Sequence, residues 1–215
     1  MIGVSSIGMI LFTSRPVGDA MATTIWGASS SWTLTALPLF VWMGEILFRT
    51  KLSENLFEGL APWLQKLPGG LIHVNVVGCA LFAAISGSSA ATVATVGKMS
   101  IPELRKRKYP EKILLGSLAG SGTLGLLIPP SIILIIYGVT VQESIAKLFI
   151  AGIIPGIMIA LIFMGYVIIW SLLNKNKMPL TEENYSFLNK LSKSKQLIPV
   201  ILLILGVIGS IYTGI

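Results

Sequence analysis

The chain has 215 residues, of which 53% are hydrophobic and only 12% are charged, and its mean hydropathy is +0.82. Soluble domains carry about 25% charged residues, so this composition excludes a soluble enzyme fold and indicates a protein of the lipid bilayer. The formal net charge of +7 is then better explained by the cytoplasmic loops of a membrane protein than by binding of nucleic acid, and no nucleic-acid partner is expected.

Residues 1–48 predict the N-terminal spans. The apolar stretch up to Phe12 is too short to cross a bilayer, so we expect it to be a truncated first span, whereas the run from about Ile25 to Phe48 is long enough to cross once. In residues 49–69 the sequence SENLFEGLAPWLQKLP repeats apolar side chains at three- and four-residue spacings. This pattern predicts an amphipathic arm helix that lies in the membrane interface.

Residues 70–97 contain no Asp, Glu, Lys or Arg, and the sequence Ser86-Gly87-Ser88-Ser89 interrupts them near the middle. This stretch is either one long helix or two half-helices that meet at a polar tip. The following segment, 98–112, carries six cations and the preceding one carries three, so the positive-inside rule places both flanks in the cytoplasm. A stretch that returns to the side it left is predicted to be a re-entrant hairpin.

In residues 113–215, helix-breaking residues and basic segments mark where the predicted helices begin and end. Residues 113–139 predict a discontinuous helix, because Gly120-Ser121-Gly122-Thr123 and Pro129-Pro130 interrupt them. A transmembrane helix is expected at 148–173, a second basic cytoplasmic loop at 174–196 and a last transmembrane helix at 197–215. Two crossings then separate the two basic loops, which agrees with both lying in the cytoplasm.

The two interruptions, at Ser86-Gly87-Ser88-Ser89 and between Gly120 and Pro130, are candidates for a binding site. Backbone that is not helical is tolerated at membrane depth only where it is buried in protein or lines a wet site. Hydroxyl and carbonyl oxygens at such breaks suit Na⁺, and half-helix N-termini suit an anionic substrate group. The competing interpretation is ordinary helix packing and proline kinks, but two breaks in adjacent segments favour a site. The candidate residues are Ser86, Gly87, Ser88, Ser89, Thr92, Gly122, Thr123, Pro129, Pro130 and Ser131.

A different class of function is an intramembrane serine hydrolase that uses Ser88 or Ser89 with His73. The chain has one histidine and offers no acid at the same depth, which argues against a catalytic triad. His73 and Asn75 are better interpreted as partners in hydrogen bonds between helices. No enzyme activity and no cofactor other than a coupling ion are expected.

Several longer strings resemble a known family. They are ALPLFVWMGEILFRT, LAPWLQKLPGGL, CALFAAISGSSAATVATVGKMSIPELRKRKY, GSLAGSGTLGLLIPPSIILIIYGV and SIAKLFIAGIIPGI. They are similar to the large membrane subunit of the tripartite ATP-independent periplasmic (TRAP) transporters. The resemblance implies an elevator-type symporter of a bacterial inner membrane that moves organic acid anions, often dicarboxylates or sialic acid, with a sodium gradient. It also implies two partners, a small membrane subunit and a periplasmic substrate-binding protein.

The resemblance extends to the candidate site. Ser86, Gly87, Ser88 and Ser89 correspond to the tip of the family's first re-entrant hairpin, and the double-proline region matches the unwound helix that faces it; both regions contribute to Na⁺ and substrate binding. The expected fold is an all-α polytopic membrane protein that corresponds to the first of the family's two inverted repeats. The alternative is a truncated remnant without transport activity, or a membrane interaction subunit.

Overall fold

The computed structural model describes residue 7 and residues 17–30, 32–179 and 187–213, and all regular structure in these ranges is helical. The elements are α2 (Val17–Ser29), α3 (Trp32–Phe48), α4 (Leu52–Leu64), α5 (Ile72–Ser86), α6 (Ser89–Lys106), α7 (Glu111–Gly122), η1 (Thr123–Leu126), α8 (Ile132–Val141), α9 (Ile145–Leu173), η2 (Lys175–Lys177), α10 (Phe187–Ser194), η3 (Lys195–Leu197) and α11 (Ile198–Thr213).

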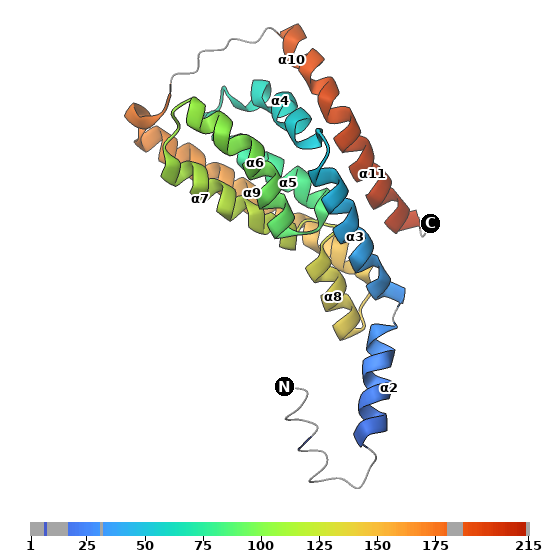
Figure 1. The fold of residues 1–215 in the computed structure, drawn as a ribbon. Helices are drawn as coiled ribbons and strands as arrows, with labels where there is room; N and C mark the ends of the chain where they lie inside the picture. Colours follow the sequence, from blue (N-terminus) through green and yellow to red (C-terminus); the bar gives the residue numbers. More distant parts are fainter. Residues whose placement is uncertain (1–6, 8–16, 31, 180–186, 214–215) are drawn as a thin grey trace.

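Helix α5 lies at the centre of the molecule (Figure 1). It contacts α3, α4, α6, α7, α9 and α11, and 12 of its 15 residues are buried. A helix that is apolar on all sides is stable in this position, because every side of it meets protein. The largest apolar cluster forms around it and includes Phe82 of α5, Leu104 of α6 and Leu114 of α7.

Helices α5 and α6 form an antiparallel hairpin whose two ends touch. The backbone N–H of Leu71, just before α5, donates to the Oη atom of Tyr109, just after α6, at 3.1 Å. With 15 residues, α5 is about 22 Å long, which is less than the hydrocarbon thickness of about 30 Å. The hairpin is thus a feature of the fold, and its re-entrant position in a membrane stays a prediction.

The helical path from α7 to α8 is interrupted. Helix α7 ends at Gly122, η1 adds one tight turn, and α8 begins at Ile132 after a cis Pro129–Pro130 bond. Helix α9 covers this break through two glycines one turn apart. A Cβ atom placed on Gly152 would lie 2.7 Å from the carbonyl oxygen of Leu127, and one on Gly156 would lie 3.0 Å from the Ile128 side chain. The small residues therefore let α9 approach the break closely.

Among the described residues, two helices are long and apolar enough to cross a bilayer. They are Ile145–Leu173 and Asn189–Thr213, with mean hydropathies of 2.5 and 2.1. Many of their large apolar side chains are exposed, such as Ile154 (77%) and Leu173 (79%). An all-helical chain with exposed apolar helices of this length is consistent with a membrane protein.

Some helix bounds differ from the sequence expectation. The run from Ile25 to Phe48 is divided into α2 and α3 near Ser30, where Gly and Ser residues with weak helix propensity follow one another. Helix α6 continues to Lys106, well into the basic segment 98–112, because Glu, Lys and Arg are good helix formers. The expected truncated span before Phe12 lies outside the described residues, apart from residue 7.

The two basic segments lie at one end of the molecule. The α6–α7 turn, the end of α9 and α10 are grouped at this end in Figure 1, and the α8–α9 turn lies at the opposite end. Residues 180–186 of the second basic segment are outside the described part, so this position applies to residues 174–179 and 187–196. Which side of a membrane each end faces stays a prediction.

Candidate functional site

The hairpin tip and the α7–α8 break lie in direct contact. The backbone N–H of Ile132, at the start of α8, donates to the carbonyl oxygen of Gly87 at 3.1 Å. On the other side of the tip, a Cβ atom placed on Gly125 would lie 2.8 Å from the backbone nitrogen of Ser89. The two interruptions that the sequence predicts in separate segments therefore form one place in the fold.

The tip depends on Gly87. Its φ of 60° is in the left-handed region, and a Cβ atom there would lie 2.8 Å from the carbonyl oxygen of Pro130. Gly87 therefore ends α5 in the way that glycine ends many helices. Ser88 starts α6 as its N-cap, because its Oγ atom accepts from the backbone N–H of Ala91 at 3.4 Å.

Three predicted site residues of the tip are bonded to one another. The Oγ1 atom of Thr92 donates to the carbonyl oxygen of Ser88 at 2.7 Å, and the hydroxyls of Ser86 and Thr92 are 2.9 Å apart. Ser86 and Thr92 are fully buried. These hydroxyls hold the tip together. The Oγ atom of Ser86 also accepts from the backbone N–H of Ser88, so the Ser86 and Thr92 hydroxyl oxygens each keep one of their two lone pairs outside these bonds.

The break leaves backbone carbonyls without helical donors. Because Pro129 and Pro130 have no N–H, the carbonyls of Gly125 and Leu126, four residues earlier, lack their helical donors. The Leu126 carbonyl instead accepts from the Oγ atom of Ser131 at 2.8 Å. The carbonyl of Gly125, in the residue that packs against the tip, is the better candidate ligand for a cation.

The other predicted residues of the break differ in position. Gly122 packs closely against Val93 of α6, so it belongs to the contact with the hairpin. Thr123 is exposed, and its Oγ1 atom donates to the carbonyl oxygen of Gly120, in the last turn of α7, at 2.7 Å. The structure thus brings the tip together with Gly122 and Pro130 and leaves the Thr123 hydroxyl at the surface.

Four helix ends converge here, as the contacts above require. The C-terminal ends of α5 and η1 carry negative partial charge, and the N-terminal ends of α6 and α8 carry positive partial charge. Residues 70–97 and 113–139 contain no Asp, Glu, Lys or Arg. The site therefore offers partial charges of both signs without a formal charge, an arrangement that suits a cation beside a carboxylate.

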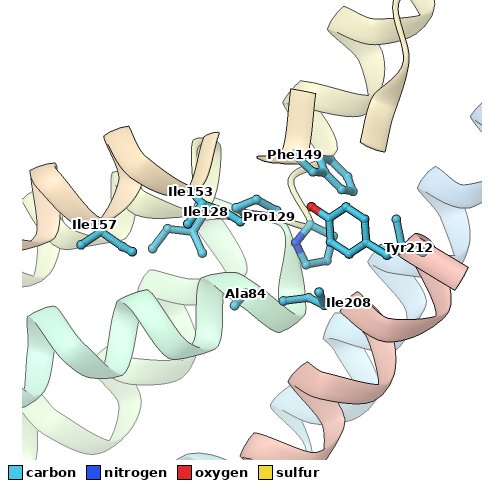
Figure 2. Close-up of a pocket in the computed structure, with 10 residues that line it drawn as sticks. Ala84, Ile128, Pro129, Phe149, Ile153, Ile157, Ile208 and Tyr212 are labelled. Atoms are coloured by element: carbon cyan, nitrogen blue, oxygen red, sulfur yellow. The ribbon is translucent and has the colours of Figure 1, made fainter. Parts of the chain in front are cut away.

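An apolar pocket of about 210 Å³ adjoins the break. Figure 2 shows Pro129 beside Ile128, with Phe149 of α9 and Tyr212 of α11 next to each other on its other side and Ala84 of α5 and Ile208 of α11 nearby. Its lining is almost entirely apolar, so we do not count it as part of the candidate cation site.

The geometry rules out the hydrolase interpretation. The Nε2 atom of His73 is 2.8 Å from the carbonyl oxygen of Pro68, a contact that requires Nε2 to donate. His73 is near the start of α5, so 13 residues of helix, or about 20 Å, separate it from Ser86 at the tip. A base at that distance cannot activate Ser88 or Ser89, and the hydrolase hypothesis is wrong.

Asn75 has a structural role of the kind expected from the sequence. Its Nδ2 atom donates to the carbonyl oxygen of Leu114 at 3.2 Å and to the Oγ atom of Ser117 at 3.1 Å. These bonds join α5 to α7.

Sequence reasoning missed three glycines that shape the site. Gly125 meets the tip, Gly152 meets the break, and a Cβ atom on Gly44 of α3 would lie 3.6 Å from the Cβ atom of Ser86. For Gly152, the GxxxG spacing with Gly156 is a signal in the sequence that indicates a close helix approach.

Comparison with known proteins identifies relatives of the whole chain. The family model described as "Tripartite ATP-independent periplasmic transporter, DctM component" matches residues 1–215. A C4-dicarboxylate TRAP transporter large permease protein of Pseudomonas aeruginosa is 34% identical over 213 residues, which are 99% of this chain and 49% of that protein. An isethionate TRAP transporter permease protein of Oleidesulfovibrio alaskensis is 33% identical over 217 residues, covering 100% of this chain and 33% of that protein.

A sialic acid TRAP transporter large permease protein of Vibrio cholerae is 36% identical over 170 residues, covering 78% of this chain and 40% of that protein. The chain thus spans about half or less of the length of these relatives.

Proposed function

Because this chain belongs to the DctM component family of the tripartite ATP-independent periplasmic transporters, we propose that it supplies about half of the large permease of a secondary transporter that imports organic acid anions. The names of the relatives support this substrate class, since they specify C4-dicarboxylates, isethionate and sialic acid. The match of the two breaks to the first hairpin and unwound helix of the family supports assignment to the N-terminal half.

We further propose that Na⁺ binds where the hairpin tip meets the break, together with the acidic group of the substrate. The observation that carries this proposal is the contact of Gly87 and Ser89 with Ile132 and Gly125, which brings four helix ends together. The carbonyl of Gly125 and the hydroxyls of Ser86, Ser88 and Thr92 are the candidate oxygen ligands. The N-terminal ends of α6 and α8 are the candidate partners of a carboxylate.

The rest of the proposal concerns the assembled transporter. A second half, a small membrane subunit and a periplasmic binding protein complete it in a bacterial inner membrane. The body that contains the hairpin carries Na⁺ and substrate across as an elevator. The short α5, which does not reach across a bilayer, supports a hairpin that enters and leaves on one side.

The test compares two glycine variants of the complete transporter in proteoliposomes. In Gly125→Ala the new methyl group meets the backbone of Ser89, whereas Gly116→Ala in α7 has no atom within 4 Å of its new Cβ atom. Overpacking costs about 1 to 3 kcal/mol, so we expect Gly125→Ala to weaken the Na⁺ dependence of uptake about tenfold or more. Gly116→Ala should transport like the unmodified protein.

The measurement is uptake of labelled succinate, isethionate or sialic acid against external Na⁺ concentration. Melting temperatures in detergent show whether each variant is folded. Equal Na⁺ dependence in the two variants contradicts the site. Uptake that persists when K⁺ replaces Na⁺ contradicts the coupling, and an inserted assembly that takes up none of these anions favours the remnant alternative.

A further inference from the structure

A tryptophan of helix α4 contacts helix α10. The Nε1 atom of Trp63, on α4, donates to the Oγ atom of Ser194 on α10 at 2.8 Å. The Nζ atom of Lys190 lies 5.5 Å from the centroid of the Trp63 ring, a distance at which a cation interacts favourably with the ring face. Trp63 nevertheless keeps 44% of its surface exposed.

The two segments are joined at further points along α4. The Nε2 atom of Gln196, in η3, donates to the Oε2 atom of Glu58, in α4, at 2.9 Å. One residue further along, Gly59 packs directly under the side chain of Leu197. The orientation of Trp63 relative to α10 is therefore fixed by contacts between residues more than 130 positions apart in the sequence.

The segment of α10 and η3 that contacts α4 is basic and partly apolar. Residues 187–197 contain Lys190, Lys193 and Lys195 and no Asp or Glu. Between these lysines, the side chain of Leu191 is 53% exposed. We name Trp63, Lys190, Leu191, Lys193 and Lys195 the α10 patch; it combines an exposed indole, an exposed aliphatic group and three cations.

We propose that the α10 patch binds the headgroup of an anionic phospholipid of the cytoplasmic leaflet. Tryptophan favours the headgroup level of a bilayer, and lysine side chains reach from there to phosphate oxygens. Lysines near the surface of an anionic leaflet each contribute favourably to binding. Charge complementarity thus selects the headgroup, and Leu191 contacts the start of the acyl chains.

The test uses a control of equal charge from the same basic segment. The double variant Lys190→Gln/Lys193→Gln removes two charges from the α10 patch. The control, Lys175→Gln/Lys177→Gln, removes two charges from η2, where both lysines are exposed. The full chain in neutral detergent is titrated with short-chain phosphatidylglycerol, and native mass spectrometry counts the bound lipids.

Each lysine near an anionic surface is worth about a fivefold change in affinity. We therefore expect the α10 pair to weaken phosphatidylglycerol binding by about 25-fold. The η2 pair should change binding less than about twofold. Phosphatidylcholine should bind weakly to all three proteins, and inorganic phosphate should not displace the bound lipid.

Trp63→Phe keeps an aromatic ring and loses the Nε1 donor, so it tests the fixed orientation if a lysine variant fails to fold. It should weaken phosphatidylglycerol binding without lowering the melting temperature by more than a few degrees. Equal losses in the two lysine pairs would indicate unspecific attraction and overturn the proposal. Equal binding of the two lipids, displacement by inorganic phosphate, or an unaffected Trp63→Phe would also overturn it.

Discussion

Tyr109 joins the two ends of the hairpin through a single hydroxyl group. Its Oη atom accepts from the N–H of Leu71, and its side chain packs against both apolar clusters of the core. Burial raises the pKa of Tyr109 above its ordinary value of 10, and the bond from Leu71 and the charge of Arg107 lower this pKa by less. A raised pKa in the folded state means that folding favours the protonated phenol.

We therefore predict a loss of stability in alkali that depends on Tyr109. The contribution is complete below pH 10 and is lost as the pH rises through the raised pKa of Tyr109. Tyr109→Phe should cost about 1 kcal/mol at pH 8, because the Leu71 N–H loses its acceptor. It should also reduce the alkaline loss, which thermal unfolding in detergent between pH 8 and pH 11 measures. An unchanged alkaline slope in Tyr109→Phe would contradict this role.

The glycines of the site show which part of it a sequence can predict. Gly87 stands in a Ser-Gly-Ser-Ser sequence, and its left-handed φ is a local property, so a turn was predictable at this residue. Pro129 and Pro130 locate the break for an equally local reason, their missing N–H groups. Gly125 was not identified because its importance comes from Ser89, which contacts it only in the folded chain.

At the scale of elements, α4 shows the limit of amphipathic patterns. The spacing of its apolar residues predicts a helix, and the structure has a helix at Leu52–Leu64. However, Leu56, Phe57 and Leu60 are buried in the main apolar cluster, so this side of α4 faces protein and not lipid. An apolar face is equally satisfied by lipid or protein, so the pattern alone does not identify what covers it. Its place in the membrane interface stays a prediction.

The contact between α4 and η3 gives a test of this packing. A Cβ atom on Gly59 would lie 2.6 Å from the Cγ atom of Leu197, so Gly59→Ala should destabilise the chain by about 1 to 3 kcal/mol. Leu197→Ala makes room for the new methyl group. In the double variant we expect less destabilisation than the sum of the two single changes, as measured by unfolding in detergent. Strictly additive effects would contradict a direct contact between these residues.

At the scale of the whole molecule, the sequence indicated the number and kind of apolar segments better than their arrangement. Charge counts suggested that the segments 98–112 and 174–196 share a side of the membrane, which stays a prediction; in Figure 1 the described parts of both lie toward the upper end of the molecule. The central position of α5 was not predictable, because it results from contacts with six other helices. These contacts join residues far apart in the chain, and neither the hydrophobic periodicity nor the composition of the sequence predicts them.

Labelling of single cysteines tests this arrangement in a membrane. In a Cys79→Ser background, Lys106→Cys and Lys175→Cys lie at the basic end, and Glu143→Cys lies in the α8–α9 turn at the other end. All three positions are exposed. A reagent that does not cross membranes should label the first two only in inside-out vesicles, and Glu143→Cys only in spheroplasts. Labelling of Lys106→Cys and Lys175→Cys from opposite sides would contradict the two crossings predicted between the basic segments.

The absence of formal charge from residues 70–97 and 113–139 has a thermodynamic consequence for a carrier. A single ion that enters such a place alone leaves its charge uncompensated in a medium of low polarity, at a cost of several kcal/mol. A cation and an anion that enter together cancel most of that cost. In the proposed permease we therefore expect electroneutrality to couple the two ligands: each monovalent cation should raise the affinity for the anion, and the half-loaded states should be the least populated.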